Sequence, residues 1–366
     1  MINLNSPVLI LRHVDQEYYL KIIKVISKIF KHCNSVNYSK LYINKGRNKF
    51  EDYLLDYIRE KKIKILIIFT HDNNFELNFN FLKKIRENNV KILFWFKDDF
   101  TNFENHSRFY AFHADGVITN YMSAFHFYEN IHVNAVYAFD AFDKKTFKPK
   151  KLKKKYDVSF IGSLDKGINS FSRSYFLKKI SKNKKIKLKI IDTIRKRIPI
   201  EELIKIYSQT KINLNFTSSG SRFEKAKKIN PFGLLTTCPK GRLIEIGLTN
   251  SFVLTEYASE LKYSFNLKKE LPVFYNEYDL LKKIEFYLSN PKKRNLISNN
   301  LYKKCISKYE IHSWTKNILL EMIYKINNSK VTRKDYQIYV PNYFLIKRIK
   351  FIIIYYLKRI RFIIKK

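Results

Sequence analysis

The feature that most constrains the fold is a regular alternation of short apolar runs and helical segments along the first 150 residues. Near-continuous Ile, Leu, Val and Phe in these runs is typical of strands buried on both faces of a parallel sheet. The first 150 residues are therefore predicted to form a doubly wound, Rossmann-like α/β domain. The strands are expected at 7–14, 63–72, 90–99, 115–120 and 133–139, and the helices between them at 16–33, 76–88 and 121–130.

A second domain of the same class follows a break in this pattern. Residues 143–157 are rich in lysine and contain Pro149, which indicates an interdomain linker. We therefore expect two α/β domains, 1–150 and 151–330, that face each other across a cleft, with ligands beside the carboxyl ends of the strands. The second set of strands is predicted at 156–164, 186–192, 211–217, 251–255 and 271–276, and its helices near 171–182, 200–209, 277–290 and 291–325.

The net charge of +39 would suit nucleic acid or an anionic membrane. Lys, Ile, Asn, Phe and Tyr are abundant together, however, while Gly and Pro number only eight each. An AT-rich genome produces this pattern without selection for binding, and the chain carries no motif of a known nucleic-acid-binding fold. No specific nucleic-acid partner is expected.

The cysteines and the apolar runs bear on where the protein works. Cys33, Cys238 and Cys305 are far apart and form no C-x-x-C pair, so neither a disulfide framework nor a zinc site is predicted. The short apolar run near the N-terminus reads as a strand and not as a signal peptide. No run reaches the roughly 18 apolar residues of a membrane span. A cytoplasmic protein is expected.

The third predicted segment, 331–366, is a membrane-associating tail, and its residues 344–366 differ in character from both domains. At about 100° per residue on a helix, its cations fall within an arc of about 180°, and most Ile and Leu side chains take the other side. A basic amphipathic helix predicts peripheral binding to an anionic membrane surface, here the inner face of the cytoplasmic membrane. The alternative is that the apolar stripe packs on the protein's own domains. The cations are Lys347, Arg348, Lys350, Lys358, Arg359, Arg361, Lys365 and Lys366, and Phe351, Ile354, Tyr355 and Phe362 project among them.

One stretch of the second domain, "CPKGRLIEIGLTNSFVLTEY" (238–257), combines two cations and a carboxylate at the start of a short helix. Pro239 suits the first helical position, and the amides after it, with Lys240 and Arg242, would bind a phosphate or diphosphate. Glu245 lies three residues beyond Arg242 on the same helix face and could accept hydrogen bonds from sugar hydroxyls. Surface cations and a helix ion pair are the simpler alternative.

The same stretch resembles the C-terminal half of GT-B-fold glycosyltransferases. The bacterial spore-maturation-protein-like branch (glycosyl transferases group 1) is the most similar, with a pattern close to K-x-R-x-F-E followed by F-L-L-T-E-Y; Ile244 here replaces the usual aromatic residue. Other segments agree in order between 115 and 325: "YDVSFIGSL", "IPIEELIKIYSQTKINLNF", "YDLLKKIEFYLSNPKKRNLI" and "HSW". "ILFWFKDDF" and "DGVITN" resemble the N-terminal domain more loosely.

The resemblance implies an enzyme that transfers a sugar from a nucleotide-diphosphate donor to a glycan or lipid-linked acceptor, as in surface glycan or lipopolysaccharide synthesis. The first domain would hold the acceptor, and the second would hold the donor. Lys240 and Arg242 would contact the diphosphate, Glu245 the ribose, and Gly162 and Ser163 would form the turn nearest the sugar phosphate. Thr237 stands where many such enzymes carry a further acidic residue, and Glu256 would face the cleft.

A catalytic base is expected in the first domain if the reaction inverts the sugar configuration. Asp98, Asp72 and His13 are the candidates, because each lies at the carboxyl end of a predicted parallel strand; His71 and Asp99 adjoin them. Any of these aspartates could instead cap a helix. His312 and Trp314 are expected to pack between the terminal helix and the domain.

No Asp-x-Asp occurs in the chain, so no metal and no cofactor beyond the nucleotide sugar is predicted. Two alternatives stay open: a GT-B module that binds sugar nucleotides without turnover, and a basic nucleic-acid-binding protein.

Overall fold

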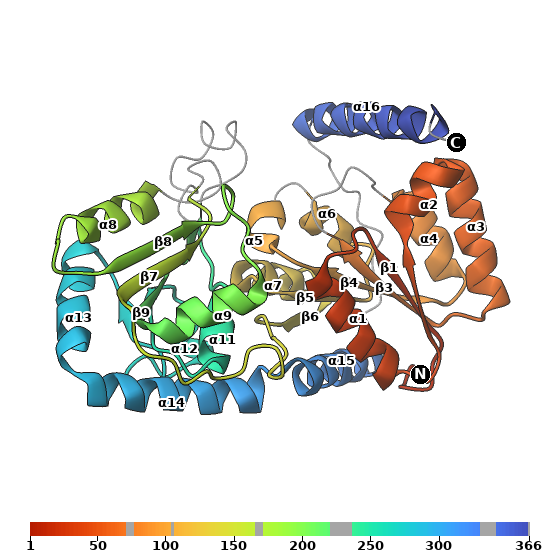
Figure 1. The fold of residues 1–366 in the computed structure, drawn as a ribbon. Coiled ribbons are helices and arrows are strands. Elements are labelled where there is room, and N and C mark those ends of the chain that lie inside the picture. The colour runs from red at the N-terminus through yellow and green to blue at the C-terminus, as the bar shows by residue number, and fades with distance from the viewer. Residues whose placement is uncertain (71–76, 104–105, 165–170, 220–235, 330–341, 365–366) are drawn as a thin grey trace. The chain divides into compact units, whose positions relative to one another are not determined.

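A computed structural model describes residues 1–366 apart from 71–76, 104–105, 165–170, 220–235, 330–341 and 365–366 (Figure 1). The chain forms two compact units. Unit 1 comprises Met1–Ala138 and Thr315–Lys366, and unit 2 comprises Phe139–Trp314. Each unit has its own parallel sheet, so the predicted pair of α/β domains is confirmed.

The sheet of unit 1 has six parallel strands in the order β2-β1-β3-β4-β5-β6. Register is continuous: Val8 pairs with both Cys33 and Ile65, and Ile65 pairs with Lys91. The strands are β1 (Val8–Arg12), β2 (Cys33–Asn37), β3 (Ile65–Thr70), β4 (Lys91–Phe96), β5 (Gly116–Thr119) and β6 (Asn134–Tyr137). The helices are α1 (Glu17–Ile29), α2 (Tyr38–Lys45), α3 (Arg47–Glu60), α4 (Phe79–Glu87), α5 (Asp99–Asn102), α6 (Ser107–Ala111), α7 (Met122–Asn130), α15 (Ile311–Asn328) and α16 (Asn342–Ile364).

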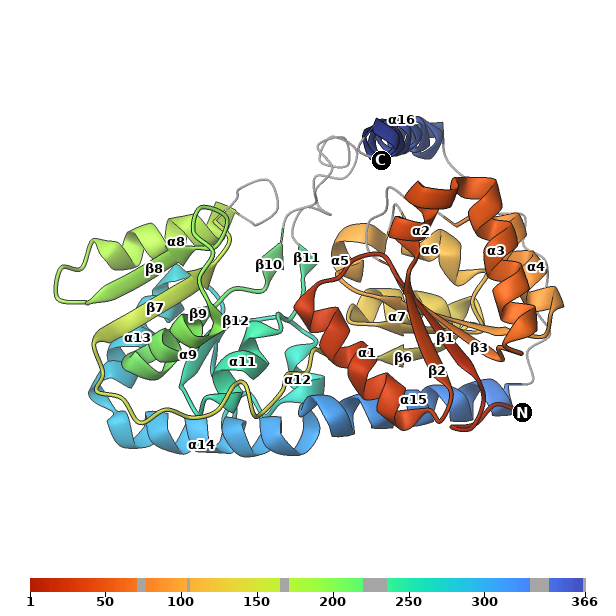
Figure 2. The ribbon, with the colours of Figure 1, turned by 45° about the vertical axis from the view of Figure 1, so that its right-hand side comes forward.

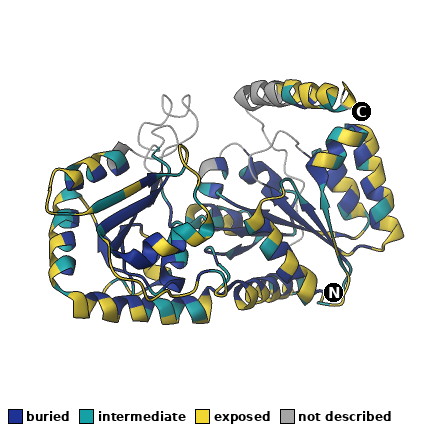
Figure 3. Cartoon of the chain, viewed as in Figure 1, coloured by how far each residue is buried: buried dark blue, intermediate teal, exposed yellow. Residues whose placement is uncertain are grey.

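Both faces of this sheet are covered, as its apolar strands require (Figure 3). One face packs on α2, α3, α4 and α7 around Phe50, Phe81 and Phe94. The opposite face meets α1, where Tyr19 contacts Phe69, and α15. Gly116 in β5 lets α15 approach closely, because a Cβ there would lie 2.3 Å from the sulfur of Met322.

The sheet of unit 2 has five parallel strands in the order β13-β12-β9-β7-β8, and a short antiparallel pair, β10 and β11, accompanies it. The strands are β7 (Tyr156–Gly162), β8 (Leu188–Asp192), β9 (Thr210–Asn215), β10 (Ser218–Ser219), β11 (Thr236–Thr237), β12 (Val253–Glu256) and β13 (Val273–Phe274). The helices are α8 (Phe171–Ser181), α9 (Ile200–Gln209), α11 (Arg242–Leu248), α12 (Leu261–Ser264), α13 (Glu277–Ser289) and α14 (Pro291–Lys308).

One face of this second sheet packs on α8, α13 and α14 around Phe160, Phe216 and Phe274. On the other side, α11 is held tightly against α14, because a Cβ on Gly247 would lie 2.5 Å from the Cys305 sulfur. The central strands β7, β9 and β12 are therefore fixed from both sides.

The boundaries of the units differ from the predicted 1–150, 151–330 and 331–366. The segment predicted as one helix at 291–325 is two helices, and most of α15 belongs to unit 1. Lys325 Nζ donates to the carbonyl of Ala135 at 2.7 Å, and Asn327 exchanges hydrogen bonds with the backbone of Ile2. Trp314 is buried at the end of unit 2, whereas His312 is exposed.

The region between 33 and 60 was not resolved into elements by its sequence pattern, and it contains β2, α2 and α3. β2 is an edge strand with intermediate exposure, so it lacks the continuous apolar run of the inner strands. In the part of the chain that the structure describes, no helix is long and apolar enough to cross a membrane.

Candidate functional site

The polar groups of unit 2 gather where the central strands β7, β9 and β12 end. Gly162 closes β7, Asn215 closes β9 and Glu256 closes β12. Because the strands are parallel and adjacent, their carboxyl ends share one edge of the sheet. Helices α8 and α11 add two arginines, Arg173 and Arg242, to this edge.

Arg242 lies across the end of β7. Its guanidinium carbon is 5.2 Å from the ring centroid of Phe160, and its Nη1 donates to Asn215 Oδ1 at 3.2 Å. A Cβ on Gly162 would lie 2.3 Å from Arg242 Nη2, so glycine is the residue that allows this approach. The structure thus brings the predicted Gly162 and Arg242 together.

Arg173, in the first turn of α8, is a second cation that the sequence analysis did not identify. It is 3% exposed, lies 5.4 Å from the Phe160 ring centroid, and donates through Nη1 to the carbonyl of Ser163 at 2.6 Å. Among the described residues its buried Nε has no hydrogen-bond partner. Burial, and then the like charge of Arg242, lower the pKa of Arg173 to about 9, with Glu256 acting in the opposite direction.

Two cations therefore lie near each other at the end of β7, and neither forms an ion pair with a carboxylate within the part of the chain described. Burying a charge without a partner costs free energy that an anion would recover. The arrangement suits a dianionic group such as a diphosphate, which could accept from both guanidinium groups.

Glu245 follows Arg242 by three residues on α11, as predicted, and its carboxylate is held from a third element. Tyr207 of α9 donates its hydroxyl to Glu245 Oε2 at 3.1 Å. Burial raises the pKa of Glu245, and Asp140 adds to this, whereas Arg242 and the Tyr207 hydroxyl lower it. The carboxylate is positioned to accept further hydrogen bonds near Arg242.

Glu256, at the carboxyl end of β12, accepts hydrogen bonds from the residues that follow β9. Oε2 accepts from the amides of Thr217 and Ser218 at 2.9 and 2.8 Å, and Oε1 accepts from Ser218 Oγ at 2.6 Å. Glu256 therefore orders the backbone that follows β9, next to the arginine pair.

The proposed helix N-terminus at Pro239 is wrong. Helix α11 begins at Arg242, so Pro239 and Lys240 precede it. The amides of Leu243 and Ile244 donate to the carbonyls of Lys240 and Gly241, so they do not form an anion site. Lys240 is half-buried beside this turn, and Thr237 lies in β11.

In unit 1, His13 follows β1 at the carboxyl edge of the sheet. Its Nδ1 lies 3.1 Å from the carbonyl oxygen of Phe69. Because a carbonyl only accepts, Nδ1 must carry the proton, and the neutral ring then has its lone pair on Nε2. This is the tautomer that a general base requires at Nε2.

Asp98 and Asp99 follow β4 and differ sharply. Asp98 is half-buried and has φ +54°, a left-handed conformation that is costly for a residue other than glycine. Asp99 is fully buried and accepts from Ser107, from Thr119 Oγ1 at 2.7 Å and from the Tyr128 hydroxyl at 2.8 Å. Burial raises the pKa of Asp99 to about 6 in spite of these donors.

Two further groups at this edge had no signal in the sequence pattern. Lys97 is buried and donates to the Tyr18 hydroxyl at 2.9 Å. His106 is also buried, and its Nε2 lies 2.8 Å from Thr70 Oγ1. Asp72 and His71, which the sequence analysis also favoured, lie outside the described residues.

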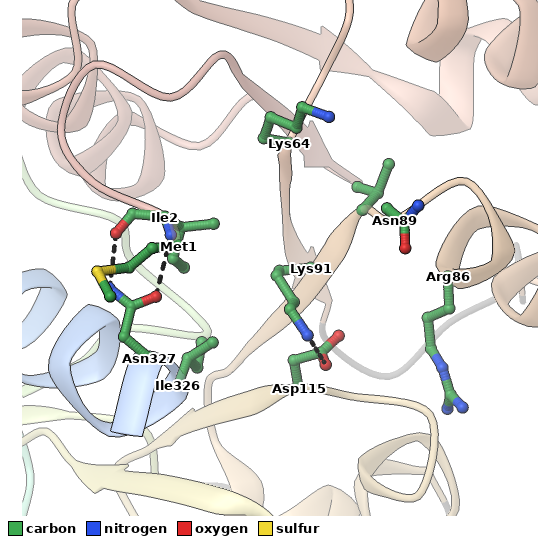
Figure 4. A pocket seen from close by; sticks show the side chains of 10 residues that line it. Met1, Ile2, Lys64, Arg86, Asn89, Lys91, Asp115, Ile326 and Asn327 are labelled. Carbon is green, nitrogen blue, oxygen red and sulfur yellow. Dashed lines mark hydrogen bonds and ion pairs between the residues drawn. The ribbon is translucent and has the colours of Figure 1, made fainter. Parts of the chain in front are cut away.

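A hollow of about 690 Å³ lies at the opposite edge of the unit 1 sheet (Figure 4). It is lined by Lys64, Lys91 and Asp115 at the amino ends of β3, β4 and β5, together with Arg86 and the first residues of the chain. Lys91 Nζ is 3.3 Å from Asp115 Oδ1. This hollow is separate from the groups described above, because it lies at the amino ends of the strands. Ligands of such sheets bind beside the carboxyl ends.

Among the described residues, no group of three or more His, Cys, Asp or Glu side chains is arranged to hold a metal ion. The cysteines are free thiols, and Cys238 and Cys305 are buried.

Comparison with known proteins assigns the fold. Residues 171–320 match the family described as glycosyl transferase-like. Solved structures share the GT-B fold, in which two such α/β domains occur. Sucrose-phosphate synthase from Thermosynechococcus elongatus gives a TM-score of 0.59 at 10% identity and covers 88% of this chain and 99% of its own. A glycosyltransferase from Rickettsia africae gives 0.58 at 13% identity over 89% and 100%.

HepE from Anabaena, solved in complex with UDP, gives a TM-score of 0.56 at 9% identity and covers 87% of this chain and 100% of its own. No curated protein matches the sequence itself.

Proposed function

We propose that the protein is a glycosyltransferase that moves a sugar from a nucleoside-diphosphate donor to an acceptor hydroxyl. The observation that carries this proposal is the pair Arg173 and Arg242, two cations without carboxylate partners in the described chain, at the carboxyl edge of a GT-B donor-type domain. The family match over 171–320 covers both arginines. The order of the sequence motifs supports placement in the spore-maturation-protein-like branch.

The donor in this proposal is held by unit 2. Arg173, Arg242 and Lys240 contact the diphosphate, Glu245 accepts from the ribose hydroxyls, and the turn at Gly162 and Ser163 approaches the sugar phosphate. Glu256 acts by ordering Thr217 and Ser218. HepE has been solved with both UDP and UDP-glucose, so a uridine diphosphate donor is the first to test.

The reaction forms a bond between the acceptor oxygen and the anomeric carbon and breaks the bond from that carbon to the diphosphate oxygen. The negative charge that develops on the departing diphosphate is stabilised by Arg173 and Arg242, a role that a metal ion fills in other transferases. The acceptor proton goes to a base of unit 1. His13 is the candidate that the tautomer favours; Asp98 and Asp72 are the alternatives.

We place the acceptor among glycans and lipid-linked glycans, as in surface glycan or lipopolysaccharide synthesis at the cytoplasmic face of the membrane. The support is the exposed apolar face of α16, whose Ile353, Leu357 and Ile360 are each more than half exposed.

The proposal is tested by titrating the protein with UDP, GDP, dTDP, CDP and ADP, each beside Arg242→Ala. We expect one nucleotide to bind selectively and Arg242→Ala to weaken it at least about tenfold, the value of one charge-assisted hydrogen bond. Arg195→Ala is the matched control, because Arg195 lies in the same unit with its side chain 89% exposed. Absence of nucleotide binding, or equal loss in both variants, would contradict the donor site.

A further inference from the structure

Helix α16 has two apolar strips, and only one of them is used within unit 1. Tyr355 is 7% exposed and belongs to the hydrophobic core of unit 1, where its ring meets that of Tyr42 in α2 at 5.0 Å, edge to face. Arg359, one turn further, donates to the Tyr355 hydroxyl at 2.9 Å and lies against Gly46. Tyr355 therefore lies on the docked side, and Phe362, which also departs from the amphipathic pattern of the sequence, is half-buried.

The aliphatic strip lies on the other side of the helix and is exposed (Figure 3). Its described side chains are 45–77% exposed, and on a helix at about 100° per residue they span an arc centred about 130° from Tyr355. They are Ile349, Ile352, Ile353, Tyr356, Leu357, Ile360, Ile363 and Ile364. An apolar surface of this extent is not left to water in a monomeric soluble protein without a binding role.

Cations border the exposed strip. Lys358 and Arg361 are exposed and project to one side of it, and Arg359 borders the other. An aliphatic strip bordered by the exposed cations Lys358 and Arg361 matches the chemistry of an anionic bilayer, where the aliphatic side chains enter the acyl boundary and the cations meet the headgroups. A second protein would have to supply an apolar groove with acidic residues along its border.

Helix α2, on which α16 docks, lies next to the edge of the unit 1 sheet that carries His13. Helix α2 starts directly after β2, at the carboxyl end of that strand (Figure 2). Lys40 of α2 pairs with Asp15 at 2.7 Å, and Asp15 also accepts from Arg12, so the pKa of Asp15 is held well below its usual range. Asp15 lies two residues after His13 in the same loop.

We infer that α16 binds an anionic lipid bilayer while it stays docked on α2, and so holds the carboxyl edge of the unit 1 sheet next to the lipid surface. The inference rests on the membrane setting proposed above and names its consequence for the substrate: the acceptor is lipid-linked, and its reacting hydroxyl lies close to the headgroups. A helix that only tethered the protein would impose no such limit on the acceptor.

The lipid contact is tested by flotation of the full chain with vesicles of phosphatidylcholine alone or mixed with phosphatidylglycerol. We expect binding only to the mixed vesicles and a loss of about a hundredfold or more in Ile353→Glu with Ile360→Glu. Lys358→Gln with Arg361→Gln should weaken it by about tenfold or more. Leu296→Glu is the matched control, since Leu296 is 62% exposed on α14.

Retention of vesicle binding in the Ile353 and Ile360 variant would overturn the lipid contact. The lipid contact would also be overturned if the wild-type protein did not bind vesicles and formed a dimer that is lost in this variant, because the strip would then bind a second copy of the chain. UDP affinity should not change in these variants, because α16 belongs to unit 1 and the proposed donor site to unit 2, so failure of the lipid contact and failure of the donor site are separate results.

The docked orientation is tested by energy transfer from a fluorophore to labelled headgroups, in a Cys33→Ser background. A label at Asn44→Cys, on α2, should transfer more strongly than one at Lys61→Cys, which precedes β3 at the opposite edge. Tyr355→Ala should abolish this difference and leave flotation within about twofold, because the aliphatic strip is intact. Equal transfer from both positions in the otherwise unchanged protein would overturn the orientation.

Discussion

The carboxyl edges of the two sheets both contain a buried ionisable side chain, but they differ in how many hydrogen-bond partners surround it. In unit 1, Asp99 is surrounded by three hydroxyl donors from α6, β5 and α7. In unit 2, Arg173 donates, among the described residues, only to the Ser163 carbonyl, and it has the like charge of Arg242 nearby. A buried charge whose partners come from its own fold stabilises that fold, whereas one that lacks them is suited to a ligand.

The largest expected effect is a loss of ligand affinity in unit 2, when both of its arginines are removed. Arg173→Ala combined with Arg242→Ala should reduce the affinity for inorganic pyrophosphate and UDP by about 3–6 kcal/mol, twice the range for one charge-assisted hydrogen bond. Calorimetric titration measures both ligands. The same double variant should keep or gain thermal stability without ligand, because it removes two poorly partnered charges. A large loss of stability with unchanged pyrophosphate affinity would show that the arginines serve the fold.

Asp99, in contrast to the two arginines, should affect the stability of the protein in a pH-dependent way and should not affect the affinity for UDP. Its pKa rises from 3.8 to about 6 on folding, so the folded state binds the proton more tightly than the unfolded chain. This contribution is complete below the unfolded pKa and is lost as pH rises through about 6, a change of about 3 kcal/mol. UDP affinity should not change.

Asp99→Asn therefore should gain about 3 kcal/mol relative to the unchanged protein between about pH 4 and about pH 7, measured by urea unfolding. Asp56→Asn is the control, since the Asp56 side chain is 77% exposed. A stability difference that stays constant across this range would mean that Asp99 does not titrate as its burial indicates.

The same contrast shows what the sequence could and could not predict. Strands with continuous apolar runs, such as "ILIIFT" in β3, were identified because burial on both faces leaves a clear pattern. Edge strand β2, with the sequence CNSVN, left none. Arg242 and Glu245 could be proposed as candidates because their spacing on one helix is local, while Arg173 and Tyr207 reach the same edge of the sheet from helices elsewhere in the chain.

The start of α11 was misjudged for a related reason. Pro239 fits a first helical position by local preference, yet the chain forms a turn through Lys240 and Gly241 before the helix begins. A Cβ on Gly241 would lie 2.7 Å from Asp140 Oδ2, so a close tertiary contact shapes this turn. Contacts between residues a hundred positions apart cannot be seen in a local pattern.

Two glycines sharpen the distinction between binding site and scaffold within unit 2. Gly162→Ala would place a methyl group 2.3 Å from Arg242 Nη2, the end of a flexible side chain, and 2.9 Å from the Phe160 ring, so we expect about a tenfold loss of UDP affinity with a smaller loss of stability than Gly247→Ala causes. Gly247→Ala would instead press on Cys305 and Leu301 in the α11–α14 contact and should lower stability by about 1–3 kcal/mol with UDP affinity preserved. Calorimetric titration and thermal unfolding of both variants should give opposite profiles, and identical profiles would contradict the assignment.

The smallest expected effect concerns Glu245, whose carboxylate accepts a hydrogen bond from Tyr207 within unit 2. The Tyr207 hydroxyl lowers the pKa of Glu245, which burial raises, so Tyr207→Phe should raise that pKa further. The ribose hydroxyls need an ionised acceptor, and UDP affinity in the variant should therefore fall at a higher pH than in the unchanged protein, by about 1 kcal/mol at most. Inorganic pyrophosphate has no ribose, so its affinity should not change.

Glu245→Gln is the control for this prediction. It should lower the affinity for UDP and remove the effect of Tyr207→Phe, because no carboxylate is left to titrate. Equal weakening of pyrophosphate and UDP by Tyr207→Phe would show that Tyr207 acts on the arginines and not through Glu245.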